Sequence, residues 1–216
     1  MSRRTQLPPS ASIARPDADA RLTAPSAQRN APAIAAVLAR HGPAKGRALE
    51  IASGTGQHVV AFAAALPGVT WQPTEIDASR RASINAWADA PNIRPSAALD
   101  ATAPGWGARH AGQDLIVLVN LMHLISAAEA QILLREVAQA LAPGGFFALY
   151  GPFLRDGRTV SQADAGFDAS LRMSDPAIGY KDFKDVQTWM QDAGLRPDPP
   201  IDMPSNNLML LARQAL

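Results

Sequence analysis

The sequence predicts an α/β fold in which a doubly wound, mostly parallel sheet of seven strands ends in an antiparallel hairpin. Strand-length apolar segments alternate along the chain with helical segments, which is the pattern of successive βα units. The segment 114–119 is apolar after its first residue, as expected of a parallel strand that is buried on both faces. Residues 201–203 and 208–213 flank a Pro-Ser-Asn-Asn connection, which favours a hairpin at the sheet edge.

The first half of the chain is expected to alternate helices with the first three strands. Ile34, Val37 and Leu38 share one face of a helix that stops at Gly42-Pro43. Pro73 predicts a bulge or an early end of the second strand, because a proline removes a donor from the ladder. The expected order is helix 26–38, strand 48–51, a central helix from about residue 58, strand 69–74 after the turn 66–68, helix 79–88 and strand 93–99.

The second half continues this alternation. Asp114 opens the fourth strand at the edge of the sheet opposite to the expected chemistry, so we assign it a structural role. The following helix stops at Pro143-Gly144-Gly145, which leads into the fifth strand. The expected order is strand 114–119, helix 128–141, strand 146–150, a polar loop 155–163, helices around 167–172 and at 183–193, and the two hairpin strands.

Length and composition indicate one domain. We divide the 216 residues into an N-terminal arm at 1–25, which lacks the apolar core of a signal peptide, and a domain at 26–216. The arm is expected to be flexible, and packing on the domain or on a neighbour is the alternative. The net charge of +1, from 20 basic and 19 acidic residues, gives no strong field to attract nucleic acid, and no apolar run approaches the roughly 18 residues of a membrane span. Cysteine is absent and the histidines lack metal-ligand spacing, so we expect no metal. We expect a cytoplasmic protein, and both a monomer and a homodimer stay open.

A glycine turn between the first strand and the central helix is the most informative motif. Gly54 and Gly56 permit positive φ angles and a close approach of the backbone to a ligand, and the free amides at the helix start favour an anionic group. Glu50, at the end of the strand, can accept a hydrogen bond from an ammonium, so the turn suits an amino acid. A dinucleotide site would have a third glycine where Val59 stands, so the pattern E-x-x-x-G-x-G favours another nucleoside cofactor. An ordinary structural turn is the alternative.

Acidic residues follow the ends of the first three expected strands. Glu75 can accept hydrogen bonds from both hydroxyls of a ribose, and Asp77 either competes for this role or caps the next helix. Asp100 can accept from an adenine amino group. Ligands of doubly wound sheets bind outside the carboxyl ends of the strands, so Glu50, Glu75 and Asp100 together predict a nucleoside site.

Seven blocks of the sequence also resemble one known family. They are Arg29-Asn30, the segment 49–58, Trp71-Gln72-Pro73, the segment 120–123, the segment 150–153, Phe167-Asp168-x-Ser170-Leu171-Arg172, and Met203-Pro204-x-Asn206-Asn207. Together they are similar to the methyltransferase-like protein twenty-six family, which is largely of unknown function. The resemblance covers about residues 26–213, and it departs from the family at Thr74-Glu75, which keeps a carboxylate, and at Ala163-Asp164.

The resemblance implies the Rossmann-like class I methyltransferase fold and S-adenosyl-L-methionine as the cofactor. On this basis and on the motifs above, we expect one set of residues to contact the cofactor. These are Arg29, Asn30, Glu50, Ala52, Ser53, Gly54, Gly56, His58, Glu75, Asp100 and Asn120.

Methyl transfer from a sulfonium is an in-line displacement, so the protein mainly positions the reactants and excludes water. A general base is needed only for a protonated acceptor, and His123 is the first candidate because neutral imidazole accepts a proton near pH 7. Tyr150 and Asn120 are the further candidate catalytic residues, and a structural role for His123 is the alternative. The acceptor is expected to contact Met122, His123, Tyr150, Phe153, Asn206 and Asn207, a mixture of amide and apolar groups that favours a small molecule.

Three functions are therefore compared. The first is a small-molecule methyltransferase that uses S-adenosylmethionine. The second is a protein that binds S-adenosylmethionine or S-adenosylhomocysteine without methyl transfer and acts through a partner. The third is a nicotinamide reductase, which Val59 at the position of the third glycine disfavours.

Overall fold

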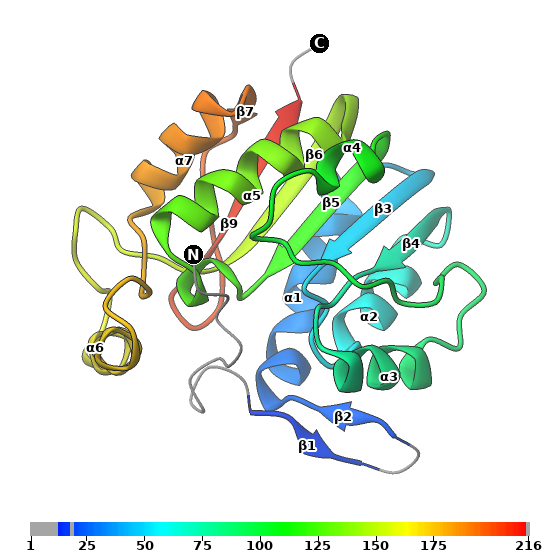
Figure 1. Cartoon of the computed structure of the whole chain (residues 1–216), viewed down its shortest axis with the longest axis horizontal. Helices are drawn as coiled ribbons and strands as arrows, with labels where there is room; N and C mark the ends of the chain where they lie inside the picture. Colours follow the sequence, from blue (N-terminus) through cyan, green and yellow to red (C-terminus); the bar gives the residue numbers. More distant parts are fainter. Residues whose placement is uncertain (1–12, 18–19, 215–216) are drawn as a thin grey trace.

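A seven-stranded sheet forms the centre of the computed structural model, which describes residues 13–17 and 20–214 (Figure 1). The strand order is β4-β3-β5-β6-β9-β7, and β8 pairs with β9. β4, β3, β5 and β6 are parallel to one another, whereas β9 is antiparallel to β6, β7 and β8. The strands are β3 (Gly46–Ile51), β4 (Val69–Pro73), β5 (Gln113–Val119), β6 (Leu141–Pro152), β7 (Leu195–Pro197), β8 (Ile201–Asp202) and β9 (Asn207–Gln214). The predicted α/β fold class and the closing hairpin are confirmed.

Helices cover both faces of the sheet, as Figure 1 shows. One face carries α1 (Pro25–His41), α2 (Gln57–Ala65) and α3 (Ala78–Trp87), and the other carries α4 (Trp106–Arg109), α5 (Ala127–Ala140) and α7 (Phe183–Asp192). The short 3₁₀ helix η1 (Met122–Leu124) follows β5, and α6 (Gln162–Ser174) lies beyond the end of the sheet. Several helices begin at the polar caps that their sequences provide: Asp77 for α3, Ser126 for α5, Ser161 for α6 and Asp182 for α7.

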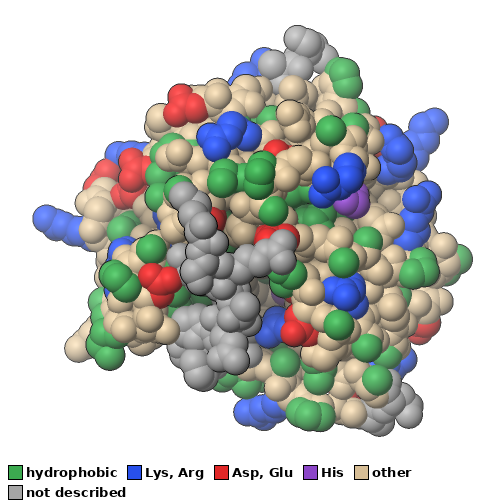
Figure 2. Space-filling view, in the orientation of Figure 1, with side chains coloured by type: hydrophobic (Ala, Val, Ile, Leu, Met, Phe, Trp, Pro, Cys, Tyr) green, Lys and Arg blue, Asp and Glu red, His purple; other side chains and the backbone are tan. Residues whose placement is uncertain are grey.

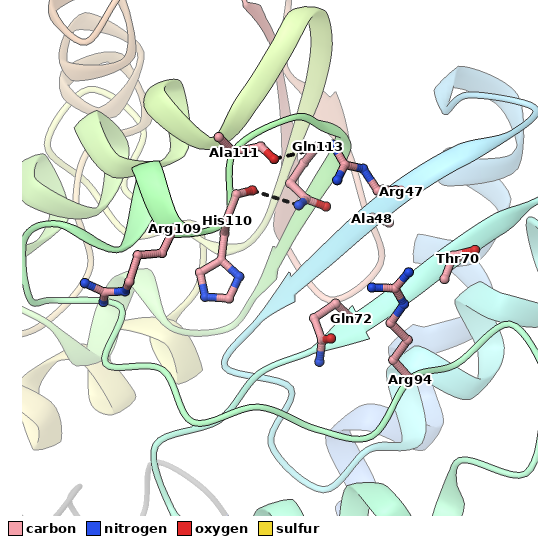
Figure 3. A pocket seen from close by; sticks show the side chains of 9 residues that line it. All are labelled: Arg47, Ala48, Thr70, Gln72, Arg94, Arg109, His110, Ala111 and Gln113. Atoms are coloured by element: carbon pink, nitrogen blue, oxygen red, sulfur yellow. Dashed lines mark hydrogen bonds between the residues drawn. The ribbon is translucent and has the colours of Figure 1, made fainter.

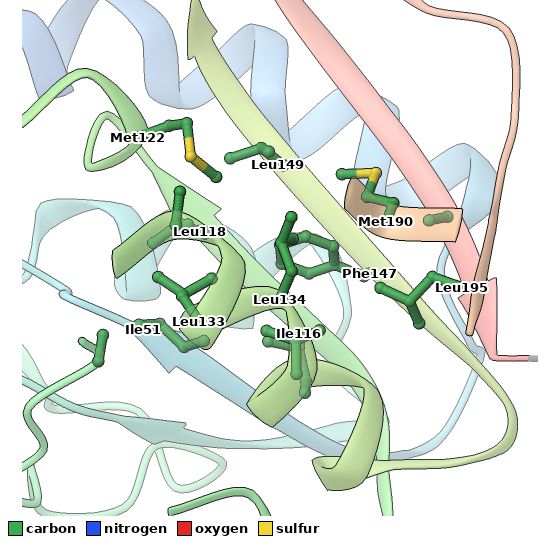
Figure 4. Packing of buried hydrophobic residues seen from close by; sticks show 14 of the residues in the cluster. Ile51, Ile116, Leu118, Met122, Leu133, Leu134, Phe147, Leu149, Met190 and Leu195 are labelled. Atoms are coloured by element: carbon green, nitrogen blue, oxygen red, sulfur yellow. The ribbon is translucent and has the colours of Figure 1, made fainter. Parts of the chain in front are cut away.

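Alternating side chains of each strand build two cores. Leu49 and Ile51 of β3 pack toward α5, whereas Ala48 packs toward α1 and α2. Figure 4 shows the first of these cores, where Leu133 and Leu134 of α5 pack on side chains of β3, β5 and β6. Because both faces of the parallel strands are buried, their sequences read as continuous apolar runs.

The predicted third strand is wrong. Residues 93–99 form only two isolated parallel bridges with β4, Trp71 to Ile93 and Thr74 to Ala97. Pro91 and Pro95 explain the difference, because neither can donate to a ladder. The seventh strand of the sheet is instead β7, a three-residue segment that the sequence analysis did not identify.

Two strand boundaries also bear on the predictions. β4 ends at Pro73, so of the two predictions made from Pro73, a bulge or an early end of the strand, the early end is confirmed. β6 starts directly after α5 at Leu141, five residues before the expected start at residue 146, and its register shifts between Gln113 and Leu115 of β5. The segment Pro143-Gly144-Gly145 therefore forms an irregular start of the strand and not a separate turn.

Part of the predicted N-terminal arm is ordered against the domain. β1 (Arg15–Pro16) and β2 (Leu22–Thr23) form a small antiparallel pair. The N–H of Leu22 donates to Ser83 Oγ at 2.8 Å, and Trp87 Nε1 donates to the Leu22 carbonyl at 3.0 Å. Residues 20–24 thus pack on α3 and are not the flexible arm that we expected there, while residues 1–12, 18 and 19 of the arm lie outside the described residues. Within the described part of the chain, none of the helices has both the length and the apolar character of a membrane span.

Candidate site at the carboxyl ends of the strands

The parallel strands end at one edge of the sheet, and the predicted site residues follow these ends (Figure 1). Glu50 lies near the end of β3, Glu75 follows β4, and Asn120 follows β5. Tyr150 lies near the end of β6, and the Asn120 N–H donates to its carbonyl at 2.9 Å. The topology therefore brings together residues that are up to about a hundred positions apart in sequence.

The glycine turn links β3 to α2, and its two glycines serve different purposes. Gly56 has a φ of +94°, and a Cβ there would lie 2.7 Å from Ile84 Cα, so glycine lets α2 pack closely on α3. Gly54 has a φ of +59°, and a Cβ there would approach only Arg80 Nη1, at 3.9 Å. The turn at Gly54 therefore leaves room beside its Cα, with only the end of the flexible Arg80 side chain in van der Waals range. Ala52, just before the turn, also has a positive φ of 53°, which is rare for a residue with a side chain.

Glu50 is a buried carboxylate with an incomplete set of partners. Its residue is 1% exposed, and its Oε2 has no hydrogen-bond partner among the described residues. Burial raises the pKa of Glu50 to about 8, a hydrogen bond with the Ser53 side chain opposes this, and the charge of Glu75 adds to it. A positively charged partner at Oε2 would offset the cost of burying this carboxylate.

Glu75 connects the end of β4 to the glycine turn. Its Oε2 accepts from the Gly54 N–H at 3.0 Å, and its Oε1 accepts from the Ile76 N–H at 2.8 Å. Asp77, the competing acid, caps α3 by accepting from the Arg80 N–H at 2.9 Å. A hydrogen bond from the Ser79 side chain contributes most to lowering the pKa of Asp77. The structure therefore gives Asp77 a local capping role and gives Glu75 a place at the turn.

Asp100 follows the bridged segment 93–97. Its Oδ1 accepts from the Thr102 N–H at 3.0 Å and from Thr102 Oγ1 at 2.7 Å, so it shapes its own loop. Its contact with a nucleobase stays a prediction.

A polar network joins four elements near the ends of the strands. His58 Nε2 of α2 lies 2.7 Å from Asn30 Oδ1 of α1, and burial lowers the pKa of His58 to about 4. Burial raises the pKa of Tyr150, while hydrogen bonds with the side chains of Asn30 and Asn207 and the charge of Arg29 oppose this. Hydrogen bonding and charge thus connect five of the predicted residues, and the Tyr150 hydroxyl is protonated at neutral pH.

His123 is enclosed on a different side of the site. Its ring packs edge to face on Phe167 of α6 and on Tyr180, with centroids 5.8 and 6.0 Å away. Burial, followed by the charge of Lys181, lowers the pKa of His123 to about 3, and Nδ1 has no partner among the described residues. The imidazole is therefore neutral at pH 7 and a weak base. Its catalytic role stays a prediction, and the packing agrees with the structural alternative.

The remaining predicted acceptor residues divide between core and hairpin. Met122 and Phe153 are buried in the apolar core under α5, at 1% and 2% exposure. The Asn206 side chain donates to Asp164 Oδ2 of α6 at 2.9 Å, and the Asn207 side chain donates to carbonyls within the turn between β8 and β9. The structure thus distributes the six residues between the apolar core, the surroundings of α6 and the hairpin, and a hydrogen bond joins the side chains of Tyr150 and Asn207.

The sequence analysis missed how α6 is held in place. Asp168 accepts from the Tyr180 N–H at 2.6 Å and from Arg172 Nε at 2.9 Å, and Arg172 also donates to the Tyr180 carbonyl at 2.9 Å. The four-residue spacing of Asp168 and Arg172 on a helix could have indicated this pair.

Tyr180 and Lys184 have the Tyr-x-x-x-Lys spacing of some nicotinamide-dependent reductases, but Lys184 pairs with Asp156 at the surface. The described residues contain no group of His, Asp or Glu that could hold a metal ion.

Comparison with known proteins identifies the fold and the family. A family described as a protein of unknown function, DUF938, matches residues 21–214. An O-methyltransferase family protein from Burkholderia thailandensis is 16% identical, with a TM-score of 0.73 over 86% of this chain and 56% of that chain. A putative O-methyltransferase from Nostoc punctiforme is 20% identical, with a TM-score of 0.73 over 85% of this chain and 55% of that chain.

A third solved structure is human N-acetylserotonin methyltransferase in complex with SAM. It is 15% identical, with a TM-score of 0.70 over 86% of this chain and 52% of that chain. The present chain thus spans about half the length of these structures. At this level of identity the similarity shows the fold, which is the class I methyltransferase fold.

Proposed function

Because this chain belongs to the family described as a protein of unknown function, DUF938, which assigns no reaction, we propose a function from its own site. We propose that the chain is an S-adenosylmethionine-dependent methyltransferase that acts on a small-molecule acceptor. The fold and the neighbours with O-methyltransferase names support this proposal. The observation that carries it is the buried carboxylate of Glu50 near the end of β3, whose Oε2 has no hydrogen-bond partner within the described part of the chain.

The residues present fit the proposed cofactor. Its amino-acid ammonium would complete the hydrogen bonding of Glu50 Oε2, and an opposite charge there would lower the pKa of Glu50 from about 8. The open side of Gly54 leaves room for a ligand against the turn. Glu75 is the proposed partner of the ribose hydroxyls, since a carboxylate oxygen can accept more than one hydrogen bond. The human neighbour bound to SAM supports the same choice of cofactor.

When bound, S-adenosylmethionine supplies an electrophilic methyl group on a sulfonium. The chain's own contribution is to hold the acceptor in line and to keep water out. Tyr150, kept protonated by burial, can donate a hydrogen bond that orients the acceptor, and hydrogen bonds with the side chains of Asn207 and Asn30 hold its hydroxyl in place. Asn120 is the proposed further acceptor contact, because its backbone is bonded to that of Tyr150.

Three finer proposals accompany this function. From the seven sequence blocks we infer that the chain belongs to the methyltransferase-like protein twenty-six group and that the domain begins near residue 26. The cytoplasmic location is a separate proposal, with which the cysteine-free sequence is compatible. The alternative function is binding of S-adenosylmethionine or S-adenosylhomocysteine without methyl transfer. No observation on the site favours this alternative over methyl transfer.

Isothermal titration calorimetry with S-adenosylmethionine tests the proposal. The wild-type protein should bind, and Glu50→Gln should weaken binding by about tenfold or more, since a hydrogen bond to a charged group contributes roughly 1.5 to 3 kcal/mol. Glu136→Gln is the matched control, because Glu136 is also buried but accepts from the Gly105 and Gly107 N–H groups beside α4. It should bind the cofactor as the wild type does.

Two outcomes would count against the proposal. Folded wild-type protein that does not bind S-adenosylmethionine at about 1 mM, a weak limit of roughly 4 kcal/mol, would contradict cofactor binding itself. If the cofactor binds but a metabolite screen with a labelled methyl group yields no methylated product, the binding-only alternative gains.

A further inference from the structure

A second polar cavity lies on the face of the sheet that carries α4, away from the site described above. It has a volume of about 180 Å³. Figure 3 shows side chains around it from β3, β4, residue 94 and the α4–β5 connection. Its lining residues are Arg47, Ala48, Thr70, Gln72, Arg94, Arg109, His110, Ala111 and Gln113.

The lining of this cavity is strongly basic. Arg47, Arg94 and Arg109 contribute three guanidinium groups, and none of the lining residues is acidic. The nearest acid in the hydrogen-bond network, Asp114, accepts from the backbone N–H of Arg47 at 2.8 Å and is not part of the lining. In a chain whose net charge is only +1, this local excess is not a consequence of a generally basic surface. In Figure 2 the Lys and Arg side chains, drawn in blue, are scattered among other residues over most of the visible face.

The three arginines differ in how they are held. Arg47 Nη2 donates to the Gly112 carbonyl at 2.5 Å and to the Ala111 carbonyl at 3.4 Å, so its guanidinium is positioned at the cavity by neutral partners. The guanidinium groups of Arg94 and Arg109 have no hydrogen bond or ion pair within the described part of the chain. In Figure 3, Arg94 lies across the cavity from Arg47, while Arg109 lies at its rim beyond His110. Guanidinium donors with no acidic partner suit an oxyanion, because such pairs form strong, often two-pronged hydrogen bonds.

The size of the cavity restricts the ligand. About 180 Å³ is far more than the roughly 10 to 15 Å³ that a single water needs, and less than the roughly 300 Å³ at which sites for larger organic ligands begin. A phosphate or diphosphate group fits this range, whereas a whole nucleotide would extend out of the cavity. Thr70 and Gln113 add polar groups to its wall.

We propose that this cavity binds a phosphate oxyanion, either as a free diphosphate or as the phosphate group of a larger small molecule, at a site distinct from the cofactor site. Arg47 and Arg94 form the two sides of the anion site, and Arg109 adds charge at its rim. The proposal does not depend on methyl transfer, because none of these side chains lies at the carboxyl ends of the strands.

Calorimetry with pyrophosphate at low ionic strength tests this site. The variants are Arg94→Ala and Arg109→Ala, which remove exposed side chains, and the matched control is Arg196→Ala, another exposed arginine, on β7 at the other edge of the sheet. We expect Arg94→Ala to raise the dissociation constant about fivefold, Arg109→Ala to raise it by a smaller factor, and the control to leave it unchanged. Adenosine diphosphate in place of pyrophosphate distinguishes a nucleotide phosphate from a free diphosphate as the source.

Several results would overturn the proposal. One is no pyrophosphate binding by the wild type up to about 10 mM in low salt. Another is equal binding by the wild type, Arg94→Ala and the control, which would mean that the anion binds elsewhere. S-adenosylmethionine binding, measured in parallel, should be the same in all variants, and a loss of it in Arg94→Ala would mean that the two sites are not distinct. Failure of pyrophosphate binding while the cofactor still binds refutes only this site.

Discussion

Replacing Glu50 with Gln should remove a pH dependence of stability that the buried carboxylate creates. The pKa of Glu50 is raised from 4.5 to about 8 in the folded protein. Between these values the folded chain holds a proton on Glu50 that the unfolded chain has released, so the folded state binds more protons. The contribution of Glu50 is therefore fully present below about pH 4.5 and is lost as the pH rises through about 8.

The size of this effect follows from the shift. At about 1.4 kcal/mol per pKa unit, the loss by pH 8 is on the order of 5 kcal/mol as an upper limit. Glu50 is 1% exposed, so solvent screening does not reduce it much. This is a large part of the roughly 5 to 15 kcal/mol that stabilises an ordinary domain. Glutamine has the same shape and no titration, so Glu50→Gln should lack this loss.

Urea unfolding of the cofactor-free protein, followed by circular dichroism at about pH 5 and about pH 8, measures the effect. Relative to Glu50→Gln, the wild type should lose several kcal/mol of unfolding free energy between these two values. The pKa values of His58 and His123 are lowered in the folded protein, so these residues make the protein less stable as the pH falls below about 6.5, which is opposite to the effect of Glu50. Both proteins share this effect, so the difference in unfolding free energy between the wild type and Glu50→Gln isolates the contribution of Glu50. Equal pH slopes for the wild type and Glu50→Gln would refute the reasoning.

Three further predictions concern the turn, the second strand end and the buried histidine. Gly56→Ala should destabilise the fold by about 1 to 3 kcal/mol, because its Cβ would lie 2.7 Å from Ile84 Cα, and an unchanged thermal midpoint would contradict this. Glu75→Ala should weaken S-adenosylmethionine binding in calorimetry. Asp77→Ala should leave binding intact and should lower the free energy of unfolding by about 0.5 to 2 kcal/mol, because it removes the cap of α3. The reverse result would assign the ribose contact to Asp77. If His123 is the base, His123→Asn should spare cofactor binding and lower turnover. The wild-type rate should then show no titration of His123 above about pH 4, because its pKa is about 3. Unchanged turnover in His123→Asn would make the role of His123 structural.

Much of the fold could be predicted because its signals are local. The apolar run of β5, the polar caps of the helices and the Pro-Ser-Asn-Asn connection each act over a few residues. The prediction of a third strand at 93–99 was wrong because Pro95 within the segment, and Pro91 just before it, remove backbone donors although the other residues suit a strand. β7 was not predicted because its three residues are too few to show the alternation of apolar and polar residues that indicates a strand.

The candidate site was predictable only in part. Parallel topology places every strand end at one edge, so the positions of Glu50 and Glu75 followed from the pattern alone. By themselves, sequence and spacing determined the fold class, the glycine turn and the acids beside it. They gave Glu50 and Glu75 different expected ligands, an ammonium and the ribose hydroxyls. They could not show that Glu75 accepts from backbone N–H groups while Glu50 Oε2 has no partner among the described residues.

Only the tertiary structure decided which side chains are buried and what they meet there. His58, Asn30, Tyr150 and Asn207 come from four separate elements, and no short-range pattern indicates their network. His123 is a candidate base from the sequence, and only the structure shows that Phe167 of α6 and Tyr180 pack on its ring and that burial lowers its pKa to about 3. Its catalytic role stays a prediction. The physical reason is the same in both cases, because desolvation and hydrogen bonding depend on groups that are distant in sequence and adjacent only after folding.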